Sequence, residues 1–247
     1  MAEPKWLQDM NPEEYLKEDF EATGHSRYTV DGLEKNDPEW LDKAAAKVNA
    51  AEGDDYVKLD SGLLTVNQIN WMLRNTFGEM TYVDDNNQFL WYNRPQDPNY
   101  KMKARRVPAQ VGDTMGAVHP DIRDVIPNAK KVVHALRTKE GGHDAVWMPV
   151  PTGNLTELVL HYYKRVEDEE GNYMGIYEWV QDIYPFVKYF CEVTGQKLVV
   201  DPDAATGATY RRNSDPDAKT GPSTKADAAK EEVKPAEPEA TSGASHH

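Results

Sequence analysis

The sequence predicts an α+β fold: a five-stranded antiparallel sheet with helices on one face, a helical N-terminal arm and a disordered C-terminal tail. Segments with a two-residue apolar period occur first as a pair and later as a group of three, with helical segments between the two groups. The arm is acidic and carries helix-start residues, whereas the tail has few large apolar residues. The 247-residue chain therefore divides into an arm at 1–58, a domain at 59–196 and a tail at 197–247.

Three short segments of the arm share a proline followed closely by an aromatic residue and leucine: "PKWL", "PEEYL" and "PEWL". In two of them Asn11 and Asp37 occupy the N-cap position, with Pro12 and Pro38 at the first helical position. We expect short amphipathic helices here. Their aromatic–leucine pairs either dock on the main domain or bind a partner protein.

The central domain begins with a predicted helix at 65–77, where apolar residues recur at helical spacing. Residues 79–93 read as a hairpin with an Asp-Asp-Asn-Asn turn. An amphipathic helix at 122–136 is followed by Gly141 and Gly142, which terminate it. Three strands follow, in "DAVWMPVP", "LTELVLHYYKRV" and "YMGIYEWVQDI", and "YPFVKYFCEV" continues as a helix. This order predicts an antiparallel sheet with its helices on one face.

The tail is rich in Ala, Pro, Lys, Glu, Ser and Thr. From residue 203 onward, Tyr210 and Val233 are its only sizeable apolar residues. Such a composition buries too little surface to offset the entropy of the chain, so we expect disorder.

The composition also excludes several classes of partner. The formal net charge is -14, and "KMKARR" is the only basic cluster, so the chain repels nucleic acid and anionic lipid. No apolar run is long enough to span a membrane, and no secretory signal opens the chain. The single cysteine, Cys191, allows neither an internal disulfide nor a cysteine metal cluster. We expect a cytoplasmic protein with no nucleic-acid or membrane partner.

Four segments of the domain resemble the PAS family: "MTYVDDNNQFLWYN", "VGDTMGAVHP", "GGHDAVWMPV" and "YYKRVEDEEGNYMGIYEWVQDI". More narrowly, residues 62–185 are similar to the PAS domain at the C-terminal end of DUF438 proteins. The arm does not resemble the hemerythrin-like region that often precedes that domain, so none of that region's chemistry is carried over. The residues of the last segment that fall where the family's pattern has them are Tyr163, Asp168, Gly171, Tyr173, Gly175, Glu178, Gln181, Asp182 and Ile183.

The resemblance implies a sensor or interaction module with a PAS-like sheet, a small pocket between sheet and helices, and outer surfaces that often dimerise. The residues that we expect to face inward, toward the pocket, are Tyr82, Leu90, Tyr92, Met115, Trp147, Leu160, Tyr162, Ile176 and Glu178. These residues either line a ligand pocket or fill a hydrophobic core. The opposite face is then expected to carry Trp91, His161, Tyr163, Tyr177 and Trp179, and to need cover from the arm, a second subunit or another protein.

The last predicted strand ends in Gln181, Asp182, Ile183 and Tyr184. In PAS relatives this junction commonly reads Asp-Ile-Thr and passes a signal to the following helix. Here Tyr184 stands in place of the threonine. The resemblance implies that a change in the pocket reaches the helix through this junction.

The acid cluster from Glu167 to Glu170 precedes Gly171 and raises the question of a calcium loop. With Gly171 at the sixth position of an EF-hand loop, the first position is Val166, which offers no oxygen ligand. We predict instead a solvated turn between two strands, with Gly171 supplying a positive φ.

Haem-holding PAS domains use an axial histidine, for which His119 or His134 would serve here, although no histidine pair has metal-ligand spacing. Cys191 lies after the last strand, not on the early helices where flavin photochemistry needs it. No nucleophile elbow or phosphate loop occurs. We predict a non-catalytic sensor or interaction module that binds a small molecule or protein and bears no cofactor. The alternatives are a dimeric scaffold without a ligand and a haem-based redox or gas sensor.

Overall fold

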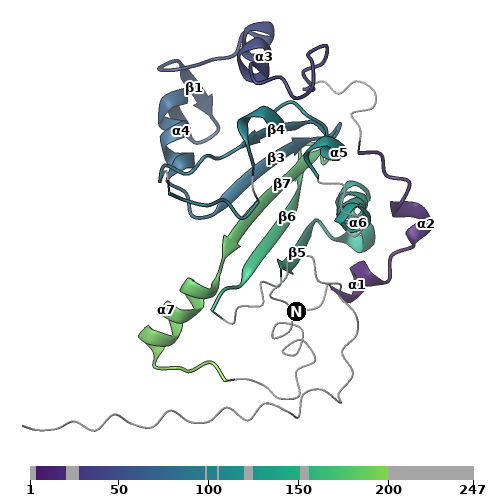
Figure 1. Cartoon of the computed structure of the whole chain (residues 1–247), viewed down its shortest axis with the longest axis vertical. Helices are drawn as coiled ribbons and strands as arrows, with labels where there is room; N and C mark the ends of the chain where they lie inside the picture. The colour runs from purple at the N-terminus through teal and green to yellow at the C-terminus, as the bar shows by residue number, and fades with distance from the viewer. Residues whose placement is uncertain are drawn as a thin grey trace, which may run out of the picture.

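The computed structural model supports the predicted fold class (Figure 1). The predicted tail lies almost wholly outside the described residues. The structure describes residues 4–20, 28–97, 99–104, 106–119, 125–150 and 156–199.

A five-stranded antiparallel sheet forms the centre of the domain, as predicted, with strand order β4-β3-β7-β6-β5. The last strand in sequence, β7, lies in the middle of the sheet, so residues near its centre contact both halves of the fold. The strands are β3 (Glu79–Asp84), β4 (Phe89–Tyr92), β5 (Ala145–Val150), β6 (Val159–Glu167) and β7 (Tyr173–Asp182).

Two helices, α5 (Met115–Val118) and α6 (Val125–Thr138), lie on one face of the sheet, which we call the inner face. Buried α6 residues, among them Val133 and Leu136, pack with Val146 and Ile176 of the sheet. Two short 3-10 turns, η1 (Pro108–Gln110) and η2 (Glu140–Gly142), precede α5 and follow α6. The amphipathic pattern of 122–136 therefore predicted α6 to within a few residues.

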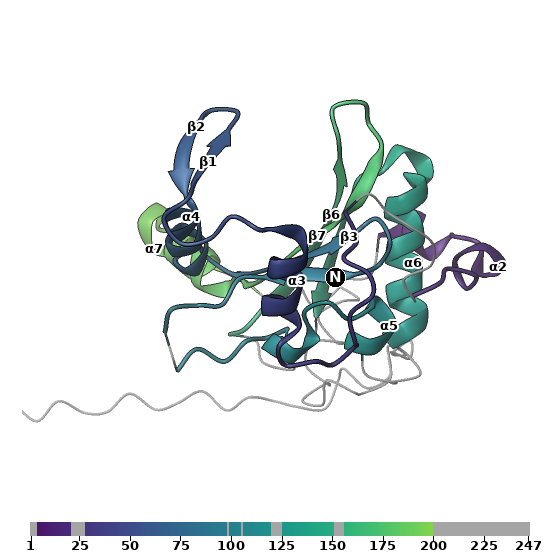
Figure 2. The same ribbon diagram turned by 90° about the horizontal axis from the view of Figure 1, so that it is seen from above.

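Two further helices, α4 (Val66–Arg74) and α7 (Tyr184–Thr194), lie on the same side of the domain (Figure 2). α4 starts with a capping box in which Thr65 and Gln68 satisfy each other's backbone N–H groups. α7 follows β7 directly and ends at Gly195 in the left-handed conformation. A two-stranded hairpin, β1 (Tyr56–Leu59) and β2 (Gly62–Thr65), precedes α4 and was not among the predicted elements.

The first part of the arm packs on the helical layer. α1 (Lys5–Gln8) and α2 (Pro12–Tyr15) lie along α6, and Figure 2 shows α2 on the side of α6 away from the sheet. Leu7 is fully buried and Phe20 is buried against the same helix. Within the described residues, the arm therefore belongs to the core of the domain.

The third helix of the arm, α3 (Trp40–Val48), docks at the other end of the sheet. Trp40 is buried against Phe89 and Val111. Its ring passes so close to Gly112 that a Cβ there would lie 2.0 Å from the Trp40 ring, and Gly112 has a φ of +95°. Leu41 and Leu16, by contrast, are exposed, so the second and third aromatic–leucine pairs dock only through their aromatic residues. Both residues of the first pair, Trp6 and Leu7, pack against the core.

Polar side chains fix the arm to the β3–β4 turn and to the segment before α5. Thr29 Oγ1 donates to Asp84 at 2.6 Å, and Gln88 exchanges hydrogen bonds with the backbone of Val30. Asn36 donates its backbone N–H to Asp113 at 2.8 Å. Because these acceptors are buried, each bond satisfies a group that would otherwise be costly to bury.

Candidate ligand-binding site

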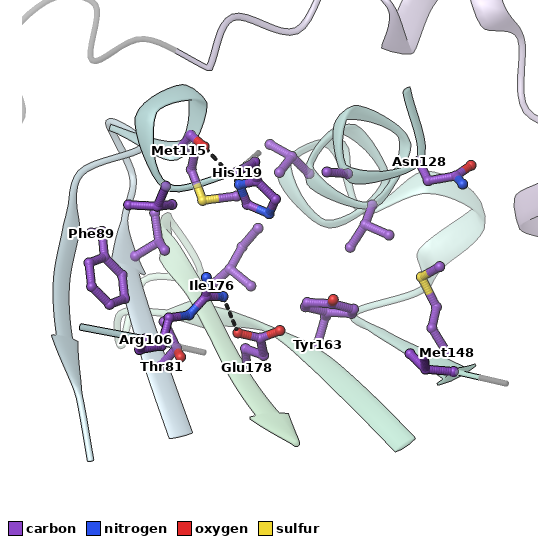
Figure 3. Close-up of a pocket in the computed structure, with 16 residues that line it drawn as sticks. Thr81, Phe89, Arg106, Met115, His119, Asn128, Met148, Tyr163, Ile176 and Glu178 are labelled. Carbon is purple, nitrogen blue, oxygen red and sulfur yellow. Dashed lines mark hydrogen bonds and ion pairs between the residues drawn. The ribbon is translucent and has the colours of Figure 1, made fainter. Parts of the chain in front are cut away.

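A cavity of about 250 Å³ lies between the inner face of the sheet and helices α5 and α6 (Figure 3). An apolar cavity of about 150 Å³ is enough for a benzene molecule, so this one has room for one ring with a short substituent. A porphyrin, with four pyrrole rings, is far larger, so the cavity does not fit haem. The apolar part of its wall consists of Val83, Phe89, Met115, Val118, Ala129, Val132, Val133, Met148, Val150 and Ile176.

Six polar residues complete the wall, and the strongest interaction among them is an ion pair. Arg106 Nη2 donates to Glu178 Oε2 at 2.9 Å, and both side chains are largely buried. The guanidinium also lies over the Phe89 ring, 5.5 Å from its centre. The polar wall residues are Thr81, Arg106, His119, Asn128, Tyr163 and Glu178.

His161 extends this network along the sheet. Its Nδ1 lies 3.0 Å from Glu178 Oε1 and 3.1 Å from the Tyr163 hydroxyl. Burial by itself would raise the pKa of Glu178. The hydrogen bond from His161 and the charge of Arg106 outweigh burial and hold that pKa well below its usual range. Burial and the nearby charge of Glu178 raise the pKa of Tyr163 well above its usual value. At neutral pH the network thus holds one carboxylate and a protonated phenol.

His119 faces this network from the helical layer. Its Nδ1 lies 2.7 Å from the carbonyl oxygen of Met115. Burial lowers the pKa of His119, and the charge of Arg106 contributes to the lowering. The ring is therefore neutral near pH 7, with its proton on Nδ1 and an acceptor lone pair on Nε2. Figure 3 shows the ring turned toward the space above Ile176 and Tyr163.

The structure brings three of the nine predicted pocket residues together in this wall: Met115, Ile176 and Glu178. The other six lie elsewhere. For four of them the prediction was wrong, because they lie on the outer face of the sheet and not on the face that lines the cavity. Tyr82 pairs with Tyr177, Tyr162 pairs with Trp179, and both pairs lie on the outer face of the sheet. Trp147 contacts Tyr162 on that face. Leu160 is two residues before Tyr162 on β6, so its side chain points to the same face.

The remaining two predicted pocket residues lie near β4. Leu90 stands at a register irregularity of the β3–β4 pair and packs against the cluster around Trp40. Tyr92 stacks on Phe89 with ring centres 5.9 Å apart. It lines a second, more open hollow of about 630 Å³, whose wall also includes Arg94, Lys101 and Arg106.

The prediction was also wrong for His161 and Tyr163. The sequence analysis placed them on the face away from the pocket, but both lie on the inner face. Tyr163 lines the cavity, and His161 contacts Glu178 within it. A two-residue period gives the alternation of side chains but not which parity faces the core. Since β6 carries aromatic residues at both parities, its composition did not distinguish the two faces. Trp91, Tyr177 and Trp179 do lie on the outer face, as predicted.

Arg106 is a polar residue of the cavity wall that the sequence analysis missed. It belongs to the basic cluster "KMKARR", which the sequence analysis considered only as a possible nucleic-acid patch. Its Nε–H is buried and has no acceptor among the described residues. A carboxylate on the central strand, Glu178, was the available signal, because a buried carboxylate needs a cation.

The second histidine considered as a haem ligand lies outside the cavity. His134 Nδ1 lies 2.7 Å from Glu18 Oε1, so this α6 side chain faces the arm. Within the described part of the chain, no group of three His, Cys, Asp or Glu residues has metal-binding geometry.

The acid cluster is a turn, as predicted. Asp168 Oδ1 accepts the backbone N–H groups of Glu170 at 3.1 Å and Asn172 at 2.8 Å. Gly171 has a φ of +83° and is exposed, which is the conformation that the turn requires.

The junction at the end of β7 has a defined geometry. Asp182 Oδ1 accepts the backbone N–H groups of Leu158 and Tyr184, each at 3.0 Å. Ile183 donates its N–H to the Leu158 carbonyl, while Gln181 donates to the Asp182 carbonyl. Asp182 thus ties the start of α7 to the segment entering β6.

Part of the chain is similar to known proteins. Residues 69–184 match the family model of the PAS domain. Among solved structures, a C-terminal domain from Streptococcus mutans is 33% identical, with 56% of this chain and 99% of that chain covered and a TM-score of 0.49. No curated protein matches the sequence.

Two structures of VqmA from Vibrio cholerae are also similar. The VqmA dimer in the absence of target DNA is 19% identical, with 48% of this chain and 51% of that chain covered and a TM-score of 0.33. The VqmA–ligand–DNA complex is 18% identical, with 56% and 61% covered and a TM-score of 0.34. Among the residues described here, no helix is both long and apolar enough for a membrane span.

Proposed function

We propose that this chain, which belongs to the PAS domain family through residues 69–184, is a non-catalytic sensor that binds a small molecule between its sheet and α5–α6. The observation that carries the proposal is the cavity itself. Its wall is mainly apolar, but a few polar groups converge on it from two different layers of the fold. That combination is typical of small-molecule sites.

Within the PAS family, we place the domain with the PAS-like domains of DUF438-type proteins. This assignment rests on the segment from Tyr162 to Ile183, which contributes Glu178 to the cavity and Asp182 to the junction.

The electrostatics favour binding over catalysis. A general acid or base works best with a pKa near the ambient pH. The pKa of Glu178 is displaced downward and that of Tyr163 upward, so both groups move away from neutrality. The ion pair with Arg106 further reduces the availability of the Glu178 carboxylate as a base.

A route from the cavity to α7 runs along β7. Ile176 and Glu178 line the cavity, and four residues later Asp182 accepts the N–H of Tyr184 at the helix start. A ligand that displaces Glu178 therefore acts on the strand that carries the helix. This is the proposed output of the sensor.

The experiment is a search for a co-purifying small molecule. The protein is purified, denatured, and its released compounds are identified by mass spectrometry. Ala129→Phe, which fills part of the cavity from α6, is the matched variant. We expect a compound near one equivalent in the wild type and its loss in the variant. The proposal fails if the compound is retained equally by Ala129→Phe.

A second candidate function is a self-associating scaffold. The outer face of the sheet carries half-buried aromatic residues, and Trp147 is 51% exposed. Within the described residues α1 and α2 pack on α6 instead of on this face. Such an apolar face favours cover by a second copy or another protein. The residues of this outer aromatic face are Tyr82, Trp91, Trp147, Tyr162, Tyr177 and Trp179.

A further inference from the structure

The cavity wall indicates the chemistry of the ligand, an inference that rests on the proposed sensory function. Two polar atoms in the wall are placed to hydrogen-bond a ligand. One is Arg106 Nε, a buried donor with no acceptor among the described residues. The other is His119 Nε2, which is an acceptor because Nδ1 of the same ring faces the Met115 carbonyl. An unsatisfied buried donor destabilises the fold, so a ligand that supplies the missing acceptor removes a penalty already present.

The charges in the wall restrict the ligand further. Arg106 and Glu178 neutralise each other across 2.9 Å. An anionic ligand near Arg106 would also face the Glu178 carboxylate, and a cationic ligand near Glu178 would face the guanidinium. A charged group would in addition lose its hydration in a mainly apolar cavity. An uncharged polar group avoids both costs.

We infer that the cavity takes an uncharged ligand of about one ring that carries a hydrogen-bond acceptor for Arg106 Nε–H and a donor for His119 Nε2. Primary and secondary amides and hydroxy-substituted carbonyl compounds have this pair of groups. The rest of the molecule is apolar and packs between Phe89, Val133 and Ile176. His119 directly follows α5 and Arg106 belongs to the loop after β4, so such a ligand would connect these two segments.

Three probes of similar shape separate the contributions of the ligand's acceptor, donor and charge to binding: benzamide, acetophenone and benzoate. Benzamide is neutral and offers acceptor and donor, acetophenone offers the acceptor alone, and benzoate is an anion without a donor. Binding is followed by NMR of methionine methyl groups labelled with ¹³C in the full chain. Met115 and Met148 line the cavity and report binding there. Met10, Met72, Met80, Met102 and Met174 are not in its wall and serve as internal controls.

We expect benzamide to shift Met115 and Met148 selectively, with a Kd about 3–10-fold lower than that of acetophenone, the range of one net hydrogen bond. Benzoate should bind more weakly than either. His119→Phe keeps an aromatic ring but removes the acceptor, so benzamide should lose its advantage over acetophenone. His143→Phe is the matched control, because His143 is exposed and stacks on Trp6 away from the cavity wall.

Arg106→Lys provides a second, independent test if His119→Phe does not fold. Lysine keeps a cation for Glu178 but lacks the Nε–H, so benzamide and acetophenone should both weaken about threefold or more. Equal affinities of benzamide and acetophenone in the wild type, or tighter binding of benzoate, would overturn the inferred ligand class and leave the sensory function standing. If none of the probes shifts Met115 or Met148, the cavity does not admit ligands, and the inference and the sensory function both fail.

Discussion

Arg106 and Glu178 join the loop after β4 to the central strand of the sheet through an ion pair of 2.9 Å in the cavity wall. Glu178 is buried, and His161 donates to its other oxygen. A buried pair of this kind stabilises little relative to an apolar pair, but removing one partner strands the other charge. The wall of the proposed binding site is therefore also a point of structural sensitivity.

Replacing Arg106 alone should destabilise the domain. Arg106→Met leaves Glu178 ionised and supported only by His161, at a cost of roughly 3 kcal/mol in the free energy of unfolding. Urea denaturation measures this value. The double variant Arg106→Met, Glu178→Gln removes the stranded charge and should recover part of the loss. If the single and double variants are equally destabilised, the loss does not come from leaving the Glu178 carboxylate without a cation.

Stability should fall in acid because of Glu178. Its folded-state pKa lies below its ordinary value of 4.5, so its contribution is complete above that value and is lost as the pH falls toward the depressed folded value. Relative to Glu178→Gln, the wild type should lose up to roughly 1.4 kcal/mol per pH unit in this range. The test is urea denaturation of both proteins at neutral pH and at pH values below 4.5, the ordinary pKa of Glu178. A pH-independent difference between the two proteins would contradict the assigned ion pair.

The arm should contribute to the stability of the domain through Leu7. Leu7 is fully buried against α6, whereas Leu16, in the same arm, is 48% exposed. Leu7→Ala should cost about 2–5 kcal/mol and Leu16→Ala less than about 0.5 kcal/mol. Thermal or urea unfolding of both variants makes a matched comparison. Similar small effects at both positions would mean that the arm is not part of the core.

Self-association should depend on the outer aromatic face if the scaffold function holds. Trp147 is 51% exposed, with its ring 4.4 Å from that of Tyr162. The wild type should sediment as a dimer, and Trp147→Glu should sediment as a monomer because a charge cannot be buried there without a partner. Leu41→Glu, at an exposed position on α3, is the control and should leave the dimer intact. A monomeric wild type would exclude the scaffold.

The elements were predictable because their signals are local. The capping-box residues Thr65 and Gln68 define the start of α4, and Gly171 defines the β6–β7 turn. The β1–β2 hairpin was missed because its strands are four residues each and mostly exposed, so they lack the alternation of a half-buried strand. The turn residues Asp60, Ser61 and Gly62 are a sequence signal for it.

The site was only partly predictable because it depends on long-range choices. The parity of β7 was correct, since Ile176 and Glu178 face the cavity, but the parity of β6 was inverted at Tyr163. Each strand alternates on its own, and only pairing in the folded sheet fixes which parity shares a face with its neighbour. Arg106 reaches Glu178 across 72 residues, a contact that no local pattern encodes.

The central claim, that the cavity holds a small molecule, is tested most directly by methionine-methyl NMR of the full chain. The spectrum is recorded before and after addition of the small-molecule fraction extracted from cells of the protein's own source. We predict that the Met115 and Met148 signals shift while those of Met10 and Met72 do not. Unchanged Met115 and Met148 signals, or equal shifts at all four residues, would contradict ligand binding in the cavity.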